Sequence, residues 1–82
     1  MIERYQKKPV IIETVQYKGY NKKEVINFVG DSLIDDDSGL YIKTLEGNHL
    51  CSVGDFIIKG VHGEFYPCKP DIFRETYIKV EK

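Results

Sequence analysis

The chain has 82 residues and a formal net charge of −1, from 12 basic and 13 acidic side chains. A balance so close to neutral opposes the broad positive potential that nucleic-acid binders need, so we expect no extended nucleic-acid binding. The N-terminus lacks the apolar stretch of a secretion signal, and no run approaches the roughly 20 apolar residues of a membrane span, so we expect a cytoplasmic protein without membrane contact.

The N-terminal third of the chain predicts a strand and then a helix. Residues 10–17 are rich in β-branched and aromatic side chains, which favours a strand. Asn21 and Glu24 have the spacing of a capping box, which predicts a helix over residues 22–29. Gly30 stands where the end of a helix favours a positive φ angle. Apolar residues recur at helical spacing within this segment, so we expect the helix to pack on a sheet.

The rest of the chain predicts short antiparallel strands. Residues 40–45 and 48–53 flank Glu46-Gly47, which has the length and chemistry of a β-hairpin turn. Further strands are expected at 32–34, 56–59, 64–66 and 76–80, and a single helical turn at 70–73. Together the elements predict one α+β domain over residues 1–82, with a small, curved antiparallel sheet of five or six strands and one short helix packed on it.

Two cysteines and two histidines are the candidates for nucleophilic or metal chemistry. Cys51 and Cys68 are too few and too widely spaced for a disulfide framework or a metal cluster, so we expect free thiols. His49 lies two residues before Cys51, and on a strand their Cα atoms would be about 6.5–7 Å apart, too far for a catalytic dyad. The carboxylates are scattered rather than paired. The sequence therefore predicts no catalytic residue, no metal site and no cofactor.

A group of cationic and aromatic residues is the candidate binding site. The strands are expected to bring Lys59, His62, Tyr66 and Lys69 together around the turn between residues 60 and 63, with Lys8 and Arg4 as further contributors. Cations beside an aromatic ring suit a small anionic, nucleotide-like ligand, because lysines neutralise phosphates and base stacking contributes roughly 1–3 kcal/mol. Ordinary surface lysines and a half-buried tyrosine explain the same residues without a ligand.

Self-association is the other expected form of binding. A domain of this length buries only about 60–65% of its unfolded surface, so its stability must come from tight packing or from a partner subunit, and we expect a homo-oligomer. Six tyrosines and four phenylalanines are too many for one small core to hide. Tyr20 and Tyr41 are therefore candidates for exposed anchors at a protein interface.

The sequence also resembles a family of small accessory proteins of phages and prophages. The matching segments are VGDFIIKG at 53–60, GEFYPCKPDIF at 63–73, TY at 76–77, YxKKPV at 5–10 and ETVQY at 13–17, so the resemblance covers nearly the whole chain. Tyr17 stands where such proteins often have tryptophan, and Phe56 where they often have tyrosine. Both positions keep an aromatic ring, and the Tyr17 ring is a candidate for stacking on a ligand.

The resemblance implies a function directed against the bacterial host. Members of the family resemble accessory proteins whose genes are dispensable for virion assembly. This implies a protein of the host cytoplasm that inhibits antiphage defence without enzymatic activity, by sequestering a nucleotide-derived signal. Direct binding of a host defence protein is an open alternative, and a structural or regulatory accessory role for the phage is another.

Overall fold

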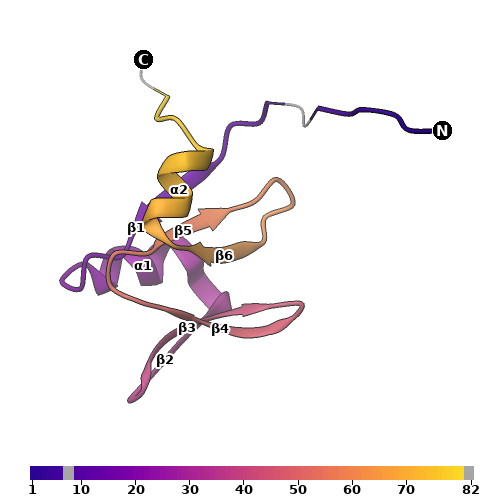
Figure 1. The fold of residues 1–82 in the computed structure, drawn as a ribbon. Coiled ribbons are helices and arrows are strands. Elements are labelled where there is room, and N and C mark those ends of the chain that lie inside the picture. The colour runs from indigo at the N-terminus through magenta and orange to yellow at the C-terminus, as the bar shows by residue number, and fades with distance from the viewer. Residues whose placement is uncertain (7–8, 81–82) are drawn as a thin grey trace.

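A computed structural model describes residues 1–6 and 9–80 (Figure 1). The elements follow one another as β1 (Glu13–Gln16), α1 (Lys22–Val29), a 3₁₀ turn η1 (Gly30–Ser32), β2 (Leu33–Asp36), β3 (Gly39–Thr44), β4 (Gly47–Cys51), β5 (Phe56–Lys59), β6 (Phe65–Cys68) and α2 (Pro70–Thr76). All strand pairs are antiparallel. The predicted α+β class is therefore confirmed.

The strands form two sheets rather than the single predicted one. Sheet A has the strand order β1-β5-β6, and sheet B has the order β2-β3-β4. The prediction of one sheet of five or six strands with a single helix is wrong in this respect, because β5 pairs with β1, far back in the sequence, and not with β4. The two sheets adjoin where β6 lies next to β3 and β4.

Sheet A is covered on both of its faces. Because side chains alternate along a strand, Ile57 and Ile58 point to opposite faces, and both are almost completely buried. Ile57 belongs to the main core between sheet A, sheet B and α1, whose other buried members are Val25, Val29, Leu40, Ile42 and Cys51. On the Ile58 face, the Phe56 ring stacks on Phe73 of α2 at 3.9 Å between centroids. The helix α2 thus closes a second, smaller apolar layer (Figure 1).

A buried carboxylate fixes the turn at which the chain passes from sheet B to sheet A. Asp55 is only 3% exposed, and its Oδ2 accepts a hydrogen bond from the Ser52 N–H at 2.9 Å. The Lys69 ammonium, at the start of α2, lies 3.4 Å from both carboxylate oxygens. The backbone also pairs with Tyr17, whose N–H donates to the Asp55 carbonyl at 2.9 Å. One residue thus connects the ends of β4 and β1 with the start of α2.

Glycine is required at the neighbouring position of this turn. Gly54 has a φ angle of +99°, which L side chains rarely adopt, and its N–H donates to the Tyr17 carbonyl. The turn therefore depends on both residues of the Gly54-Asp55 pair, one for its backbone angle and the other for its carboxylate.

The helix α1 has the predicted bounds, and Gly30 after it has the predicted positive φ, at +66°. The predicted capping box does not form, because the Asn21 side chain makes no hydrogen bond to the helical N–H groups. The Asn21 amide donates to Glu24 Oε1, and its Oδ1 accepts from the Lys18 N–H, so the side chain links the turn to the helix instead of capping the helical N–H groups.

Other predicted strands differ at their ends. The first is shorter than predicted and covers Glu13–Gln16, while β5 has the predicted bounds. β6 continues through Pro67, which is tolerated because β6 lies at the edge of sheet A. The predicted strand at 76–80 is wrong: α2 extends to Thr76, and among the described residues that follow it no strand forms.

Within the described part of the chain, neither helix is long and apolar enough to cross a bilayer.

Replacing Asp55 by alanine is expected to lower the free energy of unfolding by about 1–3 kcal/mol, because a half-buried N–H loses its acceptor and the turn loses its ion pair. Urea denaturation measures the change. Asp37→Ala, at an exposed position in the turn between β2 and β3, is the matched control and should stay within about 0.5 kcal/mol of the parent. Equal effects of the two substitutions would contradict the role assigned to Asp55.

Removing the Phe73 ring is expected to loosen α2. Phe73→Ala deletes the stack on Phe56 and should cost about 2–3 kcal/mol, because part of an aromatic side chain returns to water and leaves a gap over sheet A. Ile72→Ala, at a 53% exposed position of the same helix, should cost much less. Hydrogen exchange should show faster exchange of the α2 amides in the Phe73 variant. Unchanged protection of these amides would show that the Phe56–Phe73 stack does not hold α2 in place.

Candidate functional site

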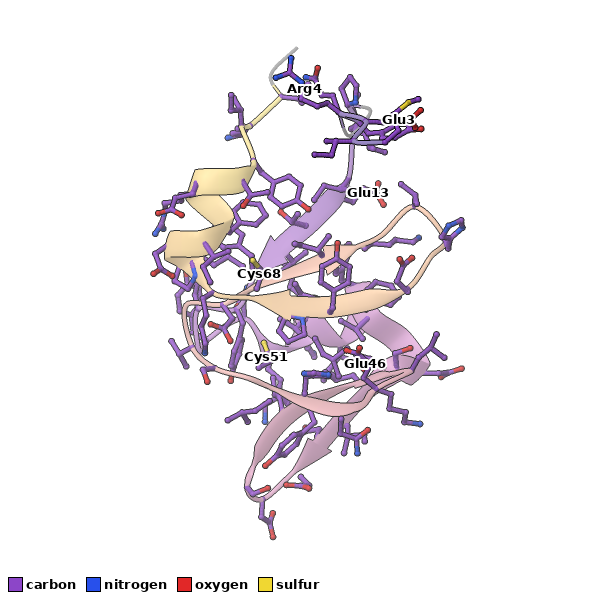
Figure 2. The ribbon with its side chains drawn as sticks, turned by 45° about the vertical axis from the view of Figure 1, so that its right-hand side comes forward. Glu3, Arg4, Glu13, Glu46, Cys51 and Cys68 are labelled. Carbon is purple, nitrogen blue, oxygen red and sulfur yellow. The ribbon has the colours of Figure 1, made fainter. Side chains whose placement is uncertain are left out.

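A cleft opens between the tip of the β3–β4 hairpin and strand β6, and we call it the hairpin cleft. Its volume is about 630 Å³. It is lined by Ser32, Lys43, Thr44, Leu45, Glu46, His49, Glu64, Phe65, Tyr66 and Pro67. Figure 2 shows Glu46 at the hairpin tip. The cleft therefore lies where sheet A meets sheet B, and residues of both sheets line it.

Phe65 gives the cleft a rigid aromatic wall. Its ring packs against the main core and meets Phe28 of α1 edge to face, at 5.4 Å between centroids. The Lys59 ammonium lies 6.0 Å from the centroid of the same ring. Lys59 and Phe65 are direct neighbours across β5 and β6, so the register itself places a cation beside the ring.

The polar groups of the cleft carry both signs of charge. His49 lies opposite Ile42 in the ladder, so its side chain is on the core side of sheet B, yet it is exposed because it lies near the hairpin end. Thr44 holds the tip by donating to the Gly47 carbonyl at 2.8 Å and accepting from the Glu46 N–H at 3.1 Å. Lys43 supplies an ammonium group and His49 an imidazole, whereas Glu46 and Glu64 supply carboxylates. Such a surface can hold a ligand that combines a flat ring, hydroxyl or amino groups and little net charge.

The predicted site residues do not gather around one turn. Lys59 pairs with Phe65 whereas Tyr66 pairs with Ile58, so the side chains of Lys59 and Tyr66 lie on opposite faces of sheet A. Lys69 lies at the other end of β6, where it pairs with Asp55. Lys59, Tyr66 and Lys69 therefore lie on two faces of sheet A and at both ends of β6.

The remaining predicted residues have separate surroundings. His62 is exposed in the β5–β6 turn, where its backbone N–H donates to Glu64 Oε1 at 2.9 Å. Tyr17 packs against the main core. Lys8 lies outside the described residues, and Arg4 is exposed far along the N-terminal segment. Of the predicted set, Tyr66 lines the hairpin cleft, and Lys59 lies beside its aromatic wall.

Tyr66 also lines a second hollow of about 470 Å³, on the α2 side of sheet A. Val10, Ile12, Tyr77 and Ile78 contribute to this hollow, which is therefore largely apolar. Burial, together with the neighbouring Tyr77 hydroxyl, raises the pKa of Tyr66 to about 12. The Tyr66 phenol is therefore neutral at physiological pH.

The two thiols are free and poorly suited to nucleophilic attack. Burial, with the Asp55 carboxylate nearby, raises the pKa of Cys51 to about 11. Burial also raises the pKa of the half-buried Cys68. Figure 2 shows Cys68 toward α2 and Cys51 toward sheet B. Since the thiolate is the reactive form, both side chains behave as small apolar groups at neutral pH.

Sequence reasoning did not single out Phe65 or Lys43 for the candidate site, and it considered His49 only as a partner of Cys51. The predicted hairpin was the available signal, but the packing of its tip beside β6 depends on how the two sheets meet. Within residues 1–6 and 9–80, no cluster of three or more His, Cys, Asp or Glu side chains is placed to hold a metal ion.

No family model matches this sequence, and no curated protein or solved structure is significantly similar to it.

The raised pKa of Cys51 predicts a loss of stability at alkaline pH. The folded-state pKa of about 11 lies above the ordinary value of 9.0, so folding favours the protonated thiol. This contribution is complete below pH 9 and is lost as the pH rises through 11. Urea midpoints measured between these limits should fall less steeply in Cys51→Ala than in the parent. Tyr66 titrates in both proteins, and parallel pH profiles would contradict the assignment to Cys51.

Proposed function

We propose that this protein is a phage-encoded binding protein without enzymatic activity, which acts in the host cytoplasm and inhibits antiphage defence by sequestering a small nucleotide-derived signal. The observation that supports it most is the hairpin cleft, in which the fixed ring of Phe65 has the Lys59 ammonium 6.0 Å from its centroid. The phage origin and the anti-defence role rest on the resemblance of the segments at 53–60 and 63–73.

The dimensions and chemistry of the cleft suit a nucleotide-sized ligand. Pockets for small molecules range over about 300–1,000 Å³, and the cleft volume of about 630 Å³ lies within this range. A base would stack on the exposed part of Phe65 while Lys43 and Lys59 neutralise a phosphate. Glu46 and Glu64 would accept hydrogen bonds from sugar hydroxyls or base amino groups. Because these carboxylates repel further negative charge, the cleft favours ligands with few phosphates.

The state of the thiols supports binding rather than turnover. A nucleophilic cysteine needs a lowered pKa and a nearby base. Cys51 has the opposite shift, and it is buried on the strand where His49 is exposed. This arrangement favours a cleft that holds its ligand unchanged.

Direct binding of a host defence protein is the second candidate, and exposed apolar side chains favour it. Tyr20 is 81% exposed, as the sequence predicts, and Leu45 at the hairpin tip is fully exposed. Tyr41 is half-buried instead of exposed, and its hydroxyl hydrogen-bonds with that of Ser38. Side chains such as Tyr20 are frequent anchors at protein interfaces.

The cleft is tested with a charge reversal at its wall. Native mass spectrometry of the full chain, mixed with a panel of cyclic and linear nucleotides, should show a stoichiometric adduct that denaturation releases unchanged. Lys43→Glu should weaken this adduct by at least about tenfold, because it replaces a phosphate-neutralising cation by a like charge. Lys23→Glu makes the same change in net charge on the exposed face of α1 and should leave binding unaltered.

Two outcomes would contradict the proposal. An adduct weakened equally by both substitutions would reflect overall charge rather than the cleft. Absence of any adduct across the panel would leave a host protein as the better candidate target, to be sought by capture from host cells with a Tyr20→Ala variant as the control.

A further inference from the structure

The second hollow, on the α2 side of sheet A, has the size of a small-molecule site. Its volume is about 470 Å³, and pockets that hold small molecules range over roughly 300–1,000 Å³. It shares some lining residues with the hairpin cleft, but the Phe65 ring is not among them. The residues that matter for binding are Val10, Ile12, Glu64, Tyr66, Tyr77 and Ile78, and we call the space that they line the α2 hollow.

Two tyrosine rings form the rigid part of the α2 hollow. Tyr66 lies on β6 opposite Ile58, which is almost completely buried. Tyr77 directly follows α2, and its ring stacks on Phe73 at 5.0 Å between centroids. Because Phe73 also stacks on Phe56 of β5, a series of three rings joins Tyr77 to sheet A. Rings that are already fixed in place lose little conformational freedom when a ligand binds.

Glu64 is the only residue with a formal charge among the described residues that line the α2 hollow. Its Oε1 accepts a hydrogen bond from the His62 N–H at 2.9 Å, which holds the carboxylate over the turn between β5 and β6. Gly60 leaves the necessary space, because a Cβ atom at this position would collide with the Glu64 carboxylate. Burial is the main cause of the raised pKa of Tyr66, and the charge of Glu64 adds to it, so the carboxylate lies near the phenol.

We propose that the α2 hollow binds a small organic cation with a methylated ammonium group, which lies beside the Glu64 carboxylate and the rings of Tyr66 and Tyr77. A cation close to a tyrosine ring is attracted by the electrons of the ring, and a neighbouring carboxylate adds Coulomb attraction. Recognition of methylated ammonium ions by aromatic side chains rests on this combination.

The apolar walls favour methyl groups on the nitrogen. An unmethylated ammonium is strongly hydrated, and it needs several hydrogen-bond acceptors to replace its water. Val10, Ile12 and Ile78 offer none through their side chains, and the hydroxyl of Thr76 already donates to the Ile72 carbonyl at 2.8 Å. Methyl groups would instead pack against these walls and gain from leaving water.

Charge separates this ligand class from the one proposed for the hairpin cleft. A phosphate in the α2 hollow would meet the Glu64 carboxylate, and no cation stands among the described lining residues to neutralise it. The hairpin cleft, by contrast, has Lys43 in its lining. The inference therefore goes beyond the proposed function and does not rest on it.

The experiment uses choline as the probe and its neutral carbon analogue, in which a tert-butyl group replaces the trimethylammonium group, as the control. NMR titration of the full chain with choline should give saturable shifts of the Tyr77 and Ile78 signals. The neutral analogue should bind at least about tenfold more weakly, because it keeps the methyl groups but lacks the charge.

Two variants test the residues, and a third is their matched control. Glu64→Gln should weaken choline binding at least about fivefold, because it removes the charge and keeps an oxygen for the His62 N–H. Tyr77→Leu should weaken it by a similar factor, because it keeps an apolar side chain but removes the ring. Glu75→Gln removes the same charge from an exposed position of α2 outside the hollow and should leave binding unaltered. Since Glu64 is exposed, its variant keeps the fold, which circular dichroism checks.

Four results would overturn the proposal. The first is the absence of saturable shifts with choline, and the second is equal affinity for choline and the neutral analogue. The third is an equal loss of affinity in Glu64→Gln and Glu75→Gln, which would reflect overall charge. The fourth is a set of shifts at Phe65 and Leu45 instead of Tyr77 and Ile78, which would assign choline to the hairpin cleft. Choline carries neither a base nor a phosphate, so these results are independent of nucleotide binding.

Discussion

The fold depends on one buried carboxylate, that of Asp55. Through its side chain it holds the Ser52 N–H and the Lys69 ammonium, and through its backbone it holds the end of β1. An acidic group that is 3% exposed is stable only where such partners compensate for its lost hydration. These contacts explain why the chain changes sheets at this point.

The same interaction determines what remains for binding. Lys69 is held at the start of α2 and is thereby separated from the cations of the hairpin cleft. Strand β6 lies beside β3 and β4, and this contact forms the hairpin cleft with Phe65 as its wall. The register of β5 and β6 then brings Lys59, rather than Lys69, to the aromatic ring. The candidate site is thus a consequence of how the two sheets are joined.

Covering both faces of sheet A leaves apolar side chains exposed elsewhere in the molecule. Sheet A has only three short strands, and both of its faces are covered, one by the main core and the other by α2. With 82 residues, this leaves little chain to cover the terminal segments, and their apolar side chains remain exposed.

Local interactions made part of the structure predictable from the sequence. The helix at 22–29 and the strand at 56–59 follow from periodicity and from neighbouring turn residues, so their predicted bounds agree with the structure. The division into two sheets and the length of α2 were not predictable in this way. They depend on the contacts of Asp55 with Lys69 and of Phe56 with Phe73, between residues 14 and 17 positions apart. The cleft likewise exists only after the sheets pack, because it joins residues of β3, β4 and β6 that no local pattern brings together.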